Sequence, residues 1–539
     1  MGLSYYLKTN KGQNRNRFFP HCHHIFSEAR FLGAGFLLFF VVAGYGQTPL
    51  LDQRISIPRQ HTSLYEALNL VSEKAGCFFI YNSETVENDK SVRLHADNQP
   101  LHEVLDNLLS DPRLAYKVMG KHILIYRNDQ KTPPSESTEQ VNIPVSGSPR
   151  DVVIRGHIRD KDGKTAIPFA TVGIVEENIG TVTNSDGYFV LRVPASLAGT
   201  SLVVSHLGYI SQRIPVGLLD EQQVDLCLER RVISIQEVII RYLDPVSILA
   251  NAMDRRKENF ATDPAYLTTF YREGVEKNGR YISYSEAVFK VYKAPVTSGE
   301  HSDQVKLLKS RKIRKEDPGD TVLLKLKAGV QSALELDIVK CIPGFLDLRP
   351  PVDYTYFYSN LIPTDHHDAY AITFTQHAGL DEALYTGTIY IDKENDAILG
   401  ADFEINPDHI EKAAVDFILK KSPNVNIQLE KITYSVSYAP FNGRYYLNHV
   451  RCDIQLKTRL RHHLSADHFS TFLELATCNI DTSEVVKFPK QELMKPDVVF
   501  SDESYTSDDA FWGSYNFIAP ETRLKEALSK IIGQIEKIE

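Results

Sequence analysis

Histidine and cysteine side chains are the residues in this chain of 539 residues that could bind a metal ion. Residues 21–24 read His-Cys-His-His, and adjacent histidine pairs stand at 366–367 and 462–463. Adjacent residues on a strand point to opposite faces of a sheet, so neither pair is suited to share one ion. The sequence therefore predicts no metal site and no cofactor.

Catalytic motifs are also missing from the sequence. Zinc peptidases hold their metal through motifs such as His-x-x-Glu or His-Glu-x-x-His. None of the 18 histidines is followed by a glutamate three residues later, and the chain has no GxSxG elbow, phosphate-binding loop or dinucleotide fingerprint. We predict that the protein is not an enzyme, with a hydrolase of dispersed catalytic residues as the alternative.

A basic run at residues 306–315 is the first of two candidate contact sites. It is interpreted either as a solvated strand edge, protected from aggregation by its charges, or as a contact for lipid phosphate or an acidic partner. We favour the strand edge. The candidate residues are Lys309, Arg311, Lys312 and Arg314.

The second candidate is Trp512, the only tryptophan of the chain, which lies in an aromatic segment at 511–518. Such a segment either anchors a lid over the core or presents rings to a ligand. We favour the lid.

The N-terminus has the composition of an export signal. Basic residues precede an apolar run at 31–43, and small residues follow it up to a cleavage point between Gly46 and Gln47. The apolar run is shorter than the roughly 20 residues that span a bilayer, although a retained anchor stays an alternative. We predict a signal peptide at 1–46, which would remove the 21–24 cluster, and a periplasmic protein associated with the outer membrane.

The net charge argues against a nucleic-acid partner, and the cysteine content bears on disulfide formation. Loss of residues 1–46 removes five basic residues and one acidic residue, so the formal net charge moves from −9 to −13. A chain this acidic, without a long basic face, is a poor nucleic-acid binder. Five scattered cysteines remain, and we expect buried thiols, with one long-range disulfide as an open alternative.

Residues 47–127 show a strand–helix pattern that occurs twice. The helical stripes are Leu64, Ala67, Leu68 and Val71, then Leu101, Val104, Leu105 and Leu108. Together with the stretches "ISIPRQHTSLYEALNLVSEKAGCFFIYNSETV" and "VRLHADNQPLHEVLDNLLSDPRLAYKVMGKHILI", they resemble the secretin and TonB short N-terminal (STN) domain. The resemblance implies a periplasmic module that contacts envelope proteins; an unrelated small α+β domain is the alternative.

A Pro- and Ser-rich linker at 128–150 leads to closely spaced short strands at 151–231. The stretches "IRGHIRDKDGKTAIPFATVGI" and "GTVTNSDGYFVLRVP" resemble the carboxypeptidase regulatory-like domain, a seven-stranded β-sandwich without catalytic zinc. Asn184 departs from the family, where aspartate is commoner at that turn position.

A connector at 232–245 contains the β-branched strip Glu237, Val238, Ile239 and Ile240. It resembles the segment that pairs with TonB as an added strand in TonB-dependent transporters. We favour a strand packed on the next domain instead, because no transporter barrel follows.

Residues 246–539 alternate apolar and polar residues over long stretches, as half-buried antiparallel strands do. We expect helices at 246–260 and from about Pro520, and a hairpin turning at Asn442-Gly443. The stretches "YTGTIYIDKENDAILGADFEI" and "FWGSYNFIAPE" resemble the C-terminal part of Bacteroidetes envelope proteins. The hairpins also resemble periplasmic lipoprotein carriers, whose curved sheet cradles acyl chains.

The predicted fold is therefore a multidomain, β-rich α+β protein: a small βαβ-type N-terminal domain, a seven-stranded sandwich, and a large antiparallel sheet with flanking helices. The main functional hypothesis is a non-enzymatic adaptor for envelope proteins, such as a TonB-system component, a transporter or an anti-sigma regulator. The alternative is a lipid or lipoprotein carrier, which requires a concave apolar surface lined by the inward faces of the hairpins.

Overall fold

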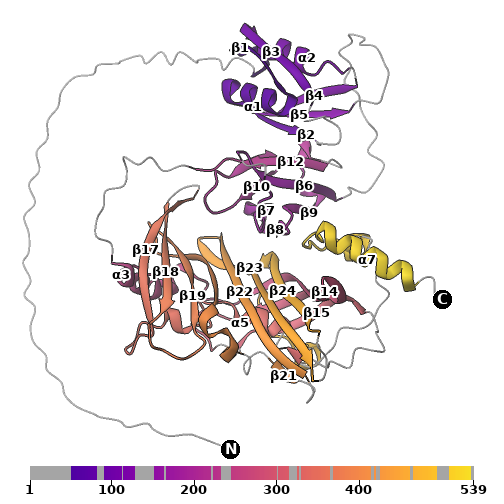
Figure 1. Ribbon diagram of the computed structural model, residues 1–539. Helices are drawn as coiled ribbons and strands as arrows, with labels where there is room; N and C mark the ends of the chain where they lie inside the picture. The colour runs from indigo at the N-terminus through magenta and orange to yellow at the C-terminus, as the bar shows by residue number, and fades with distance from the viewer. Residues whose placement is uncertain are drawn as a thin grey trace, which may run out of the picture. The chain divides into compact units, whose positions relative to one another are not determined.

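The structure is a computed structural model. It describes residues 50–81, 90–111, 113–119, 121–127, 151–162, 165–219, 223–231, 244–299, 302–314, 325–326, 329–364, 368–413, 418–420, 425–461, 465–494 and 509–535. The predicted β-rich α+β fold class is confirmed, and Figure 1 shows its elements.

The first described elements alternate strands with two helices. They are η1 (Leu50–Asp52), β1 (Arg54–Ser63), α1 (Leu64–Ala75), β2 (Phe78–Tyr81), β3 (Ser91–Pro100), α2 (Leu101–Leu108), β4 (Leu114–Met119) and β5 (His122–Arg127). Both predicted helical stripes are buried in one core. Ser63 caps α1 by accepting a hydrogen bond from the Glu66 backbone N–H, and Gly76 ends it with φ of 63°.

The seven strands of the predicted sandwich divide between two sheets around a shared core. β6 (Val152–Asp160), β9 (Tyr188–Val193) and β12 (Gln223–Leu228) lie in one sheet, in which β12 runs parallel to β6. β7 (Thr171–Ile174), β8 (Ile179–Val182), β10 (Ser201–Ser205) and β11 (Gln212–Pro215) lie in the other. Short 3-10 turns connect them: η2 (Val175–Glu177), η3 (Ala195–Leu197) and η4 (Val216–Leu218).

The largest part is an antiparallel sheet that curls into a half-barrel. Its strands, in spatial order, are β15 (Gln304–Arg314), β14 (Arg280–Lys293), β13 (Ala265–Lys277), β24 (Asp467–Asp481), β23 (Arg444–Leu460), β22 (Val425–Phe441), β20 (Ile398–Ile405), β19 (Tyr385–Asp392), β18 (Asp368–Gln376) and β17 (Tyr354–Pro363). A bridge between Asn479 of β24 and Ile179 of β8 joins it to the sandwich.

Smaller elements accompany the half-barrel. They are α3 (Pro245–Asp254), α4 (Arg256–Asn259), β16 (Lys325–Leu326), α5 (Val330–Glu335), η7 (Gly344–Leu346), η8 (Pro407–Ala413), β21 (Ile418–Lys420), η9 (Lys490–Glu492), η10 (Asp509–Trp512) and α7 (Thr522–Ile535).

The hairpin predicted at Asn442-Gly443 joins β22 to β23. Phe441 pairs with Arg444, and the two residues between them have φ of 48° and 74°. Two successive positive φ values are typical of a type I′ turn, whose twist matches that of the strands. The predicted inward face of β23 is confirmed as well, since Val450, Cys452, Ile454 and Leu456 are all buried.

The first helix of this region differs from its prediction. We expected Val246, Leu249, Ala250 and Met253 to form its apolar face. The buried residues of α3 are Ile248, Leu249 and Ala252, while Val246 is 42% exposed. The sequence offers two overlapping apolar faces here, and packing on the half-barrel selects the second.

Candidate functional site

The inner face of the half-barrel is apolar and rich in aromatic rings. Eight of the ten strands contribute fully buried side chains to it, for example Ile389 from β19 and Ile432 from β22. The two outermost strands add buried residues that are slightly more exposed, Val305 from β15 and Tyr354 from β17. The Phe403 and Tyr434 rings of neighbouring strands stack with centroids 4.8 Å apart. This is the concave apolar surface, lined by the inward faces of the hairpins, that the carrier alternative requires.

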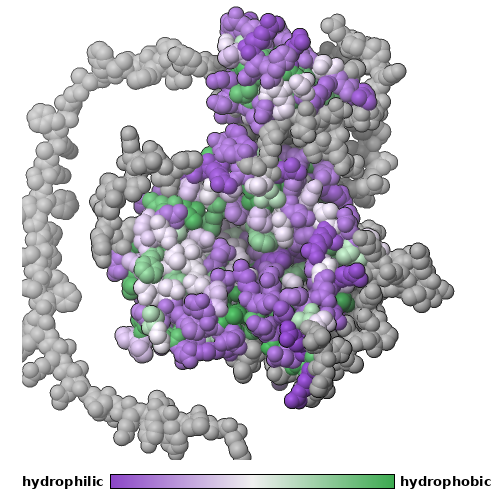
Figure 2. All heavy atoms as spheres, viewed as in Figure 1, coloured by the Kyte–Doolittle hydropathy of each residue, from purple (hydrophilic) through white to green (hydrophobic). Residues whose placement is uncertain are grey.

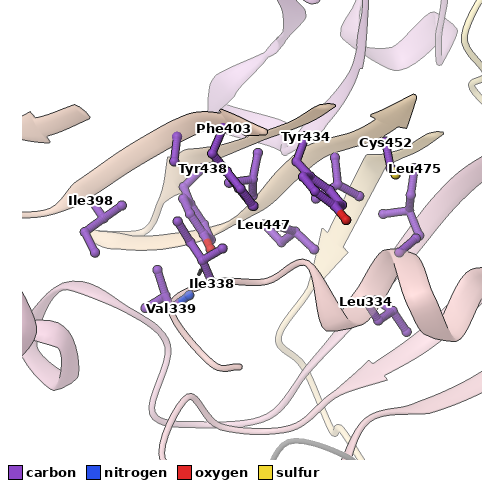
Figure 3. Packing of buried hydrophobic residues seen from close by; sticks show 14 of the residues in the cluster. Leu334, Ile338, Val339, Ile398, Phe403, Tyr434, Tyr438, Leu447, Cys452 and Leu475 are labelled. Atoms are coloured by element: carbon purple, nitrogen blue, oxygen red, sulfur yellow. Dashed lines mark hydrogen bonds between the residues drawn. The ribbon is translucent and has the colours of Figure 1, made fainter. Parts of the chain in front are cut away.

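Residues 330–348, called the inner segment below, fill that surface. Figure 1 shows the sheet curving around α5, and Figure 3 shows Leu334, Ile338 and Val339 directed toward the strands. Phe345 is fully buried at the centre of an aromatic group, stacked on Phe374 at 4.2 Å. The apolar inner face of the half-barrel, called the cradle below, is thus occupied by the protein's own apolar side chains.

Polar groups fasten the inner segment to the sheet. The Tyr438 hydroxyl donates to Asp337 Oδ1 at 2.8 Å and accepts the Val339 backbone N–H at 3.2 Å. Lys293 Nζ lies 2.7 Å from both Asp337 Oδ2 and Asp303 Oδ2, and Lys340 pairs with Asp303. We call the five side chains that make these contacts the clasp: Lys293, Asp303, Asp337, Lys340 and Tyr438.

The clasp is buried, and its charges perturb one another. Burial acts to lower the pKa of Lys293, but attraction to Asp337 and Asp303 outweighs it and raises that pKa above the usual range. Burial acts to raise the pKa of Asp303, yet the two lysines hold that pKa below its usual value. Because buried ion pairs recover little more than their desolvation cost, such groups specify one arrangement more than they add stability.

The outer face of the same sheet carries a ladder of alternating charges. Directly opposed residues on successive strands read Arg451, Glu474, Arg272, Glu286 and Arg311. We call this row the charge ladder. Opposite charges in register across strands stabilise pairing, and each residue has opposite charges on its neighbours.

Glu474 and Arg272 are the centre of the ladder, and both are fully buried. Arg272 Nε donates to Glu474 Oε2 at 2.5 Å, and His449 Nε2 lies 2.8 Å from Glu474 Oε1. Burial acts to raise the pKa of Glu474, but attraction to Arg272 and Arg451 and the bond from His449 hold it well below its usual range.

The C-terminal segment, residues 509–535, covers this ladder and reaches the sandwich. Glu521 Oε1 lies 2.7 Å from Arg272 Nη2, and Leu524 and Leu528 of α7 pack on the sheet. On its other side, the Phe517 and Ala519 carbonyls accept hydrogen bonds from the sandwich. The predicted C-terminal helix is present, with the covering role expected of it.

Trp512 lies in this segment and is fully buried against Phe270. The guanidinium carbon of Arg311 lies 4.9 Å from its ring centroid, and Lys309 Nζ lies 4.4 Å from the neighbouring Phe511 ring. The structure therefore brings Lys309, Arg311 and Trp512 of the predicted contact residues together, which the sequence did not indicate.

Arg311 is 3% exposed and bound to Glu286 at 2.6 Å, so it is not the solvated charge that we expected on a strand edge. Its place in the ladder requires it to face the C-terminal segment. Lys312 is half-buried and Arg314 pairs in register with Ser283. Glu237, Val238, Ile239 and Ile240 lie outside the described residues, as do both histidine pairs and the 21–24 cluster.

A groove of about 460 Å³ opens on the outer face beside the ladder. Threonine, serine and carboxylate side chains of β18–β20, β22 and β23 form its floor, and Phe169 of the sandwich is part of its wall. In Figure 2 hydrophilic residues predominate on the face turned to the viewer, and green is confined to patches. We call the groove beside the ladder the outer groove.

The described part of the chain contains neither a metal-binding group nor a membrane-spanning helix. No group of three or more His, Cys, Asp or Glu side chains there could hold a metal ion, and none of its helices is long and apolar enough to cross a membrane. Cys77, Cys452 and Cys478 are buried thiols, and burial raises the pKa of Cys77 and of Cys478 to about 12.

Residues 154–240 match the family model of the CarboxypepD_reg-like domain. This chain contains a CarboxypepD_reg-like domain. Domains of this kind are regulatory and not catalytic, in agreement with the sequence resemblance. The STN family was not detected, and no curated protein sequence matches the chain.

Solved structures with a partial likeness include a putative outer membrane lipoprotein-sorting protein domain from Vibrio parahaemolyticus, at 8% identity and a TM-score of 0.21, covering 45% of this chain and 95% of that one. A DUF1329 family protein from Desulfovibrio piger is 12% identical, with a TM-score of 0.21 and coverage of 46% and 96%. The ferripyoverdine receptor of Pseudomonas aeruginosa is 10% identical, with a TM-score of 0.13 and coverage of 78% and 56%. These scores are too low to transfer a function.

Neither the clasp nor the charge ladder was expected from the sequence. A signal was present, because Arg272, Glu286 and Glu474 each interrupt an apolar strand. Lone charges in such strands indicate buried pairs, but which charges pair depends on strand order, which the sequence does not show.

Proposed function

We propose that this protein is an exported envelope carrier whose half-barrel binds the acyl chain of a lipid or lipoprotein. The observation that supports the proposal is the apolar inner face, closed by one short segment of the same chain. The predicted signal peptide supports an envelope location, and the CarboxypepD_reg-like domain is assigned to contacts with partner proteins.

In the absence of ligand, the apolar side chains of the inner segment would occupy the place of the acyl chain. Burial of its apolar side chains stabilises the closed state by roughly 1.5–3 kcal/mol for each large residue. An acyl chain of about 16 carbons returns about 0.8 kcal/mol for each buried CH₂, a total of similar size. Exchange of segment for ligand therefore requires little net free energy.

The clasp would set the fraction of molecules that are open. When only a fraction of molecules is competent to bind, the apparent dissociation constant rises by the inverse of that fraction. A substitution that weakens the clasp by about 1.4 kcal/mol should therefore tighten apparent acyl binding about tenfold.

The test is titration of the mature chain with a dansylated fatty acid, together with mass spectrometry of lipid extracted from the purified protein. Asp337→Asn should tighten binding about tenfold, because it weakens the contacts of Asp337 with Lys293 and Tyr438. Asp347→Asn is the matched control, since Asp347 lies in the same segment but pairs locally with the 88% exposed side chain of Arg349.

The carrier proposal is wrong if no lipid co-purifies and neither the wild-type chain nor Asp337→Asn binds the probe. Equal binding of the probe by Asp337→Asn and Asp347→Asn would agree with acyl binding in the cradle, but it would show that the clasp does not control that binding.

A further inference from the structure

The outer groove lies on the face of the sheet opposite the cradle. Hydroxyl and carboxylate side chains line the groove, whereas apolar side chains line the cradle. Two cross-strand rows form its floor. One runs Thr373, Thr388, Asp402, Ser435 and Arg451; the other runs Thr386, Glu404, Thr433 and Asp453. Both rows are in direct register, so hydroxyl and carboxylate oxygens stand side by side across five strands.

We propose that the outer groove is a saccharide-binding site. Its volume of about 460 Å³ is within the range of roughly 300–1,000 Å³ that small-molecule pockets occupy. Hydroxyl groups donate and accept, and carboxylates accept from two or more donors, which suits a ligand with many hydroxyls.

Other ligand classes fit the floor less well. An anion would meet three carboxylates, and the one cation in the lining, Arg451, is already bound to Asp453 at 2.8 Å and to Glu474 at 3.4 Å. A metal ion has no group of suitable ligands within the described residues. An acyl chain would bury polar groups without partners. An organic cation would meet two carboxylates that are already paired, Asp453 with Arg451 and Glu404 with Lys431 at 3.7 Å. A neutral ligand rich in hydroxyls therefore fits best.

The aromatic wall of the groove supports the same assignment. Phe169 has φ of 59°, a left-handed conformation that costs a bulky residue roughly 1–3 kcal/mol. That backbone directs its ring over β23, stacked on His449 at 4.8 Å and 5.6 Å from the Arg451 guanidinium. His449 covers one face of this half-buried ring, and the rest of the ring borders the groove beside the hydroxyl and carboxylate oxygens. There it can contact the C–H groups of a sugar while the oxygens bind the sugar's hydroxyls.

Several polar groups of the floor are already oriented. The Tyr390 hydroxyl donates to Asp402 Oδ2 at 3.0 Å, and Thr373 Oγ1 lies 3.4 Å from Thr388 Oγ1. Asp402 is exposed and Thr388 half-buried, so a ligand in the groove can reach both. Groups held on strands need little reorganisation to bind, which favours specific recognition.

The experiment is titration calorimetry of the full mature chain with cellotetraose, maltotetraose and N-acetylchitotetraose, each to about 10 mM. We expect at least one to bind with a Kd at or below about 1 mM. Thr388→Val and Asp402→Asn should each weaken that binding tenfold or more. Asp408→Asn, an exposed aspartate outside the groove, is the matched control and should bind as the wild type does.

Thermal melting of each variant separates loss of binding from loss of folding. The proposal is overturned if none of the three saccharides binds, if the groove variants bind like the control, or if spermidine binds in the groove and the saccharides do not. Because the groove and the cradle lie on opposite faces, Thr388→Val and Asp402→Asn should leave unchanged whatever fatty-acid binding the wild-type chain shows, so failure of the saccharide proposal and failure of the carrier proposal are distinguishable.

Discussion

Single polar side chains decide how the sandwich is attached to the half-barrel. Asn184 shows this most clearly, because aspartate is commoner at this turn position in the family that the sequence resembles. Its Oδ1 accepts the backbone N–H groups of Asp186 and Tyr188, as an aspartate could. Its Nδ2 donates to the Ala519 carbonyl at 3.0 Å, which an aspartate could not do. The departure is therefore explained by the C-terminal segment.

Asn184→Asp should destabilise the protein by about 1–3 kcal/mol, because it removes a buried donor and places a carboxylate against a carbonyl oxygen. Urea denaturation followed by circular dichroism measures the change. Asn442→Asp is the matched control, since Asn442 is an exposed turn residue and Asp-Gly also forms type I′ turns. Equal midpoints for the two variants would show that the Ala519 contact contributes nothing.

Glu474→Gln should cost about 3–5 kcal/mol, because it leaves the fully buried Arg272 and the partly buried Arg451 short of a counter-charge. The control is Glu430→Gln, whose carboxylate is 37% exposed and should contribute less than about 1 kcal/mol. A urea midpoint for Glu474→Gln within error of this control would contradict the buried role of the ladder.

The lowered pKa of Glu474 also predicts how the stability of the fold changes with pH. A carboxyl group whose pKa is lower in the folded than in the unfolded protein stabilises the fold above its unfolded pKa of about 4.3. That stability is lost as the pH falls toward the folded pKa, and the lowered pKa of Asp303 acts in the same direction. The urea midpoint should therefore fall steadily below about pH 4.3, and less steeply in Glu474→Gln. Parallel pH profiles would contradict this assignment.

The C-terminal segment is the element that joins the layers, because it covers the charge ladder and bonds to the sandwich. The turn formed by residues 184–187 supports that contact: besides the Asn184 bond, Asp186 Oδ2 accepts the backbone N–H of Thr522. Two modules far apart in sequence are thus held by one segment.

The chain's only tryptophan makes the attachment of this segment directly measurable. Trp512 is fully buried, so its fluorescence should shift to the red when the segment detaches. We expect the fluorescence midpoint in urea to coincide with that of circular dichroism, as in a two-state transition. A fluorescence change at clearly lower urea would show instead that the segment detaches before the half-barrel unfolds.

At the scale of the whole molecule, the carrier and adaptor hypotheses assign function to different modules. The carrier proposal relies on the apolar inner face of the half-barrel within residues 244–494, whereas the adaptor hypothesis relies on the N-terminal module at 47–127. The two hypotheses do not exclude each other, because they assign partner contact and ligand binding to different modules.

Deletion of residues 47–127 from the mature chain separates the two. We expect fatty-acid binding to stay within about twofold of the full chain, because the cradle is built without that module. Cross-linking in intact cells should lose envelope partners at the same time. An unchanged set of cross-linked partners would show that this module is not the adaptor. Loss of fatty-acid binding would show that the cradle depends on the module, whose Leu124 packs in the core of the sandwich.

The sequence by itself determined the local structure. The stripes of α1 and α2, the turn at Asn442-Gly443 and the inward face of β23 follow from short-range periodicity and turn chemistry, and all are present. Tertiary structure decided which strands are neighbours. Arg272 and Glu474 stand 202 residues apart, and Asp337 and Tyr438 stand 101 apart, so neither the ladder nor the clasp has a local signature. The burial of Arg311 and the face of α3 were decided in the same way, because a side chain's environment depends on the elements that pack over it.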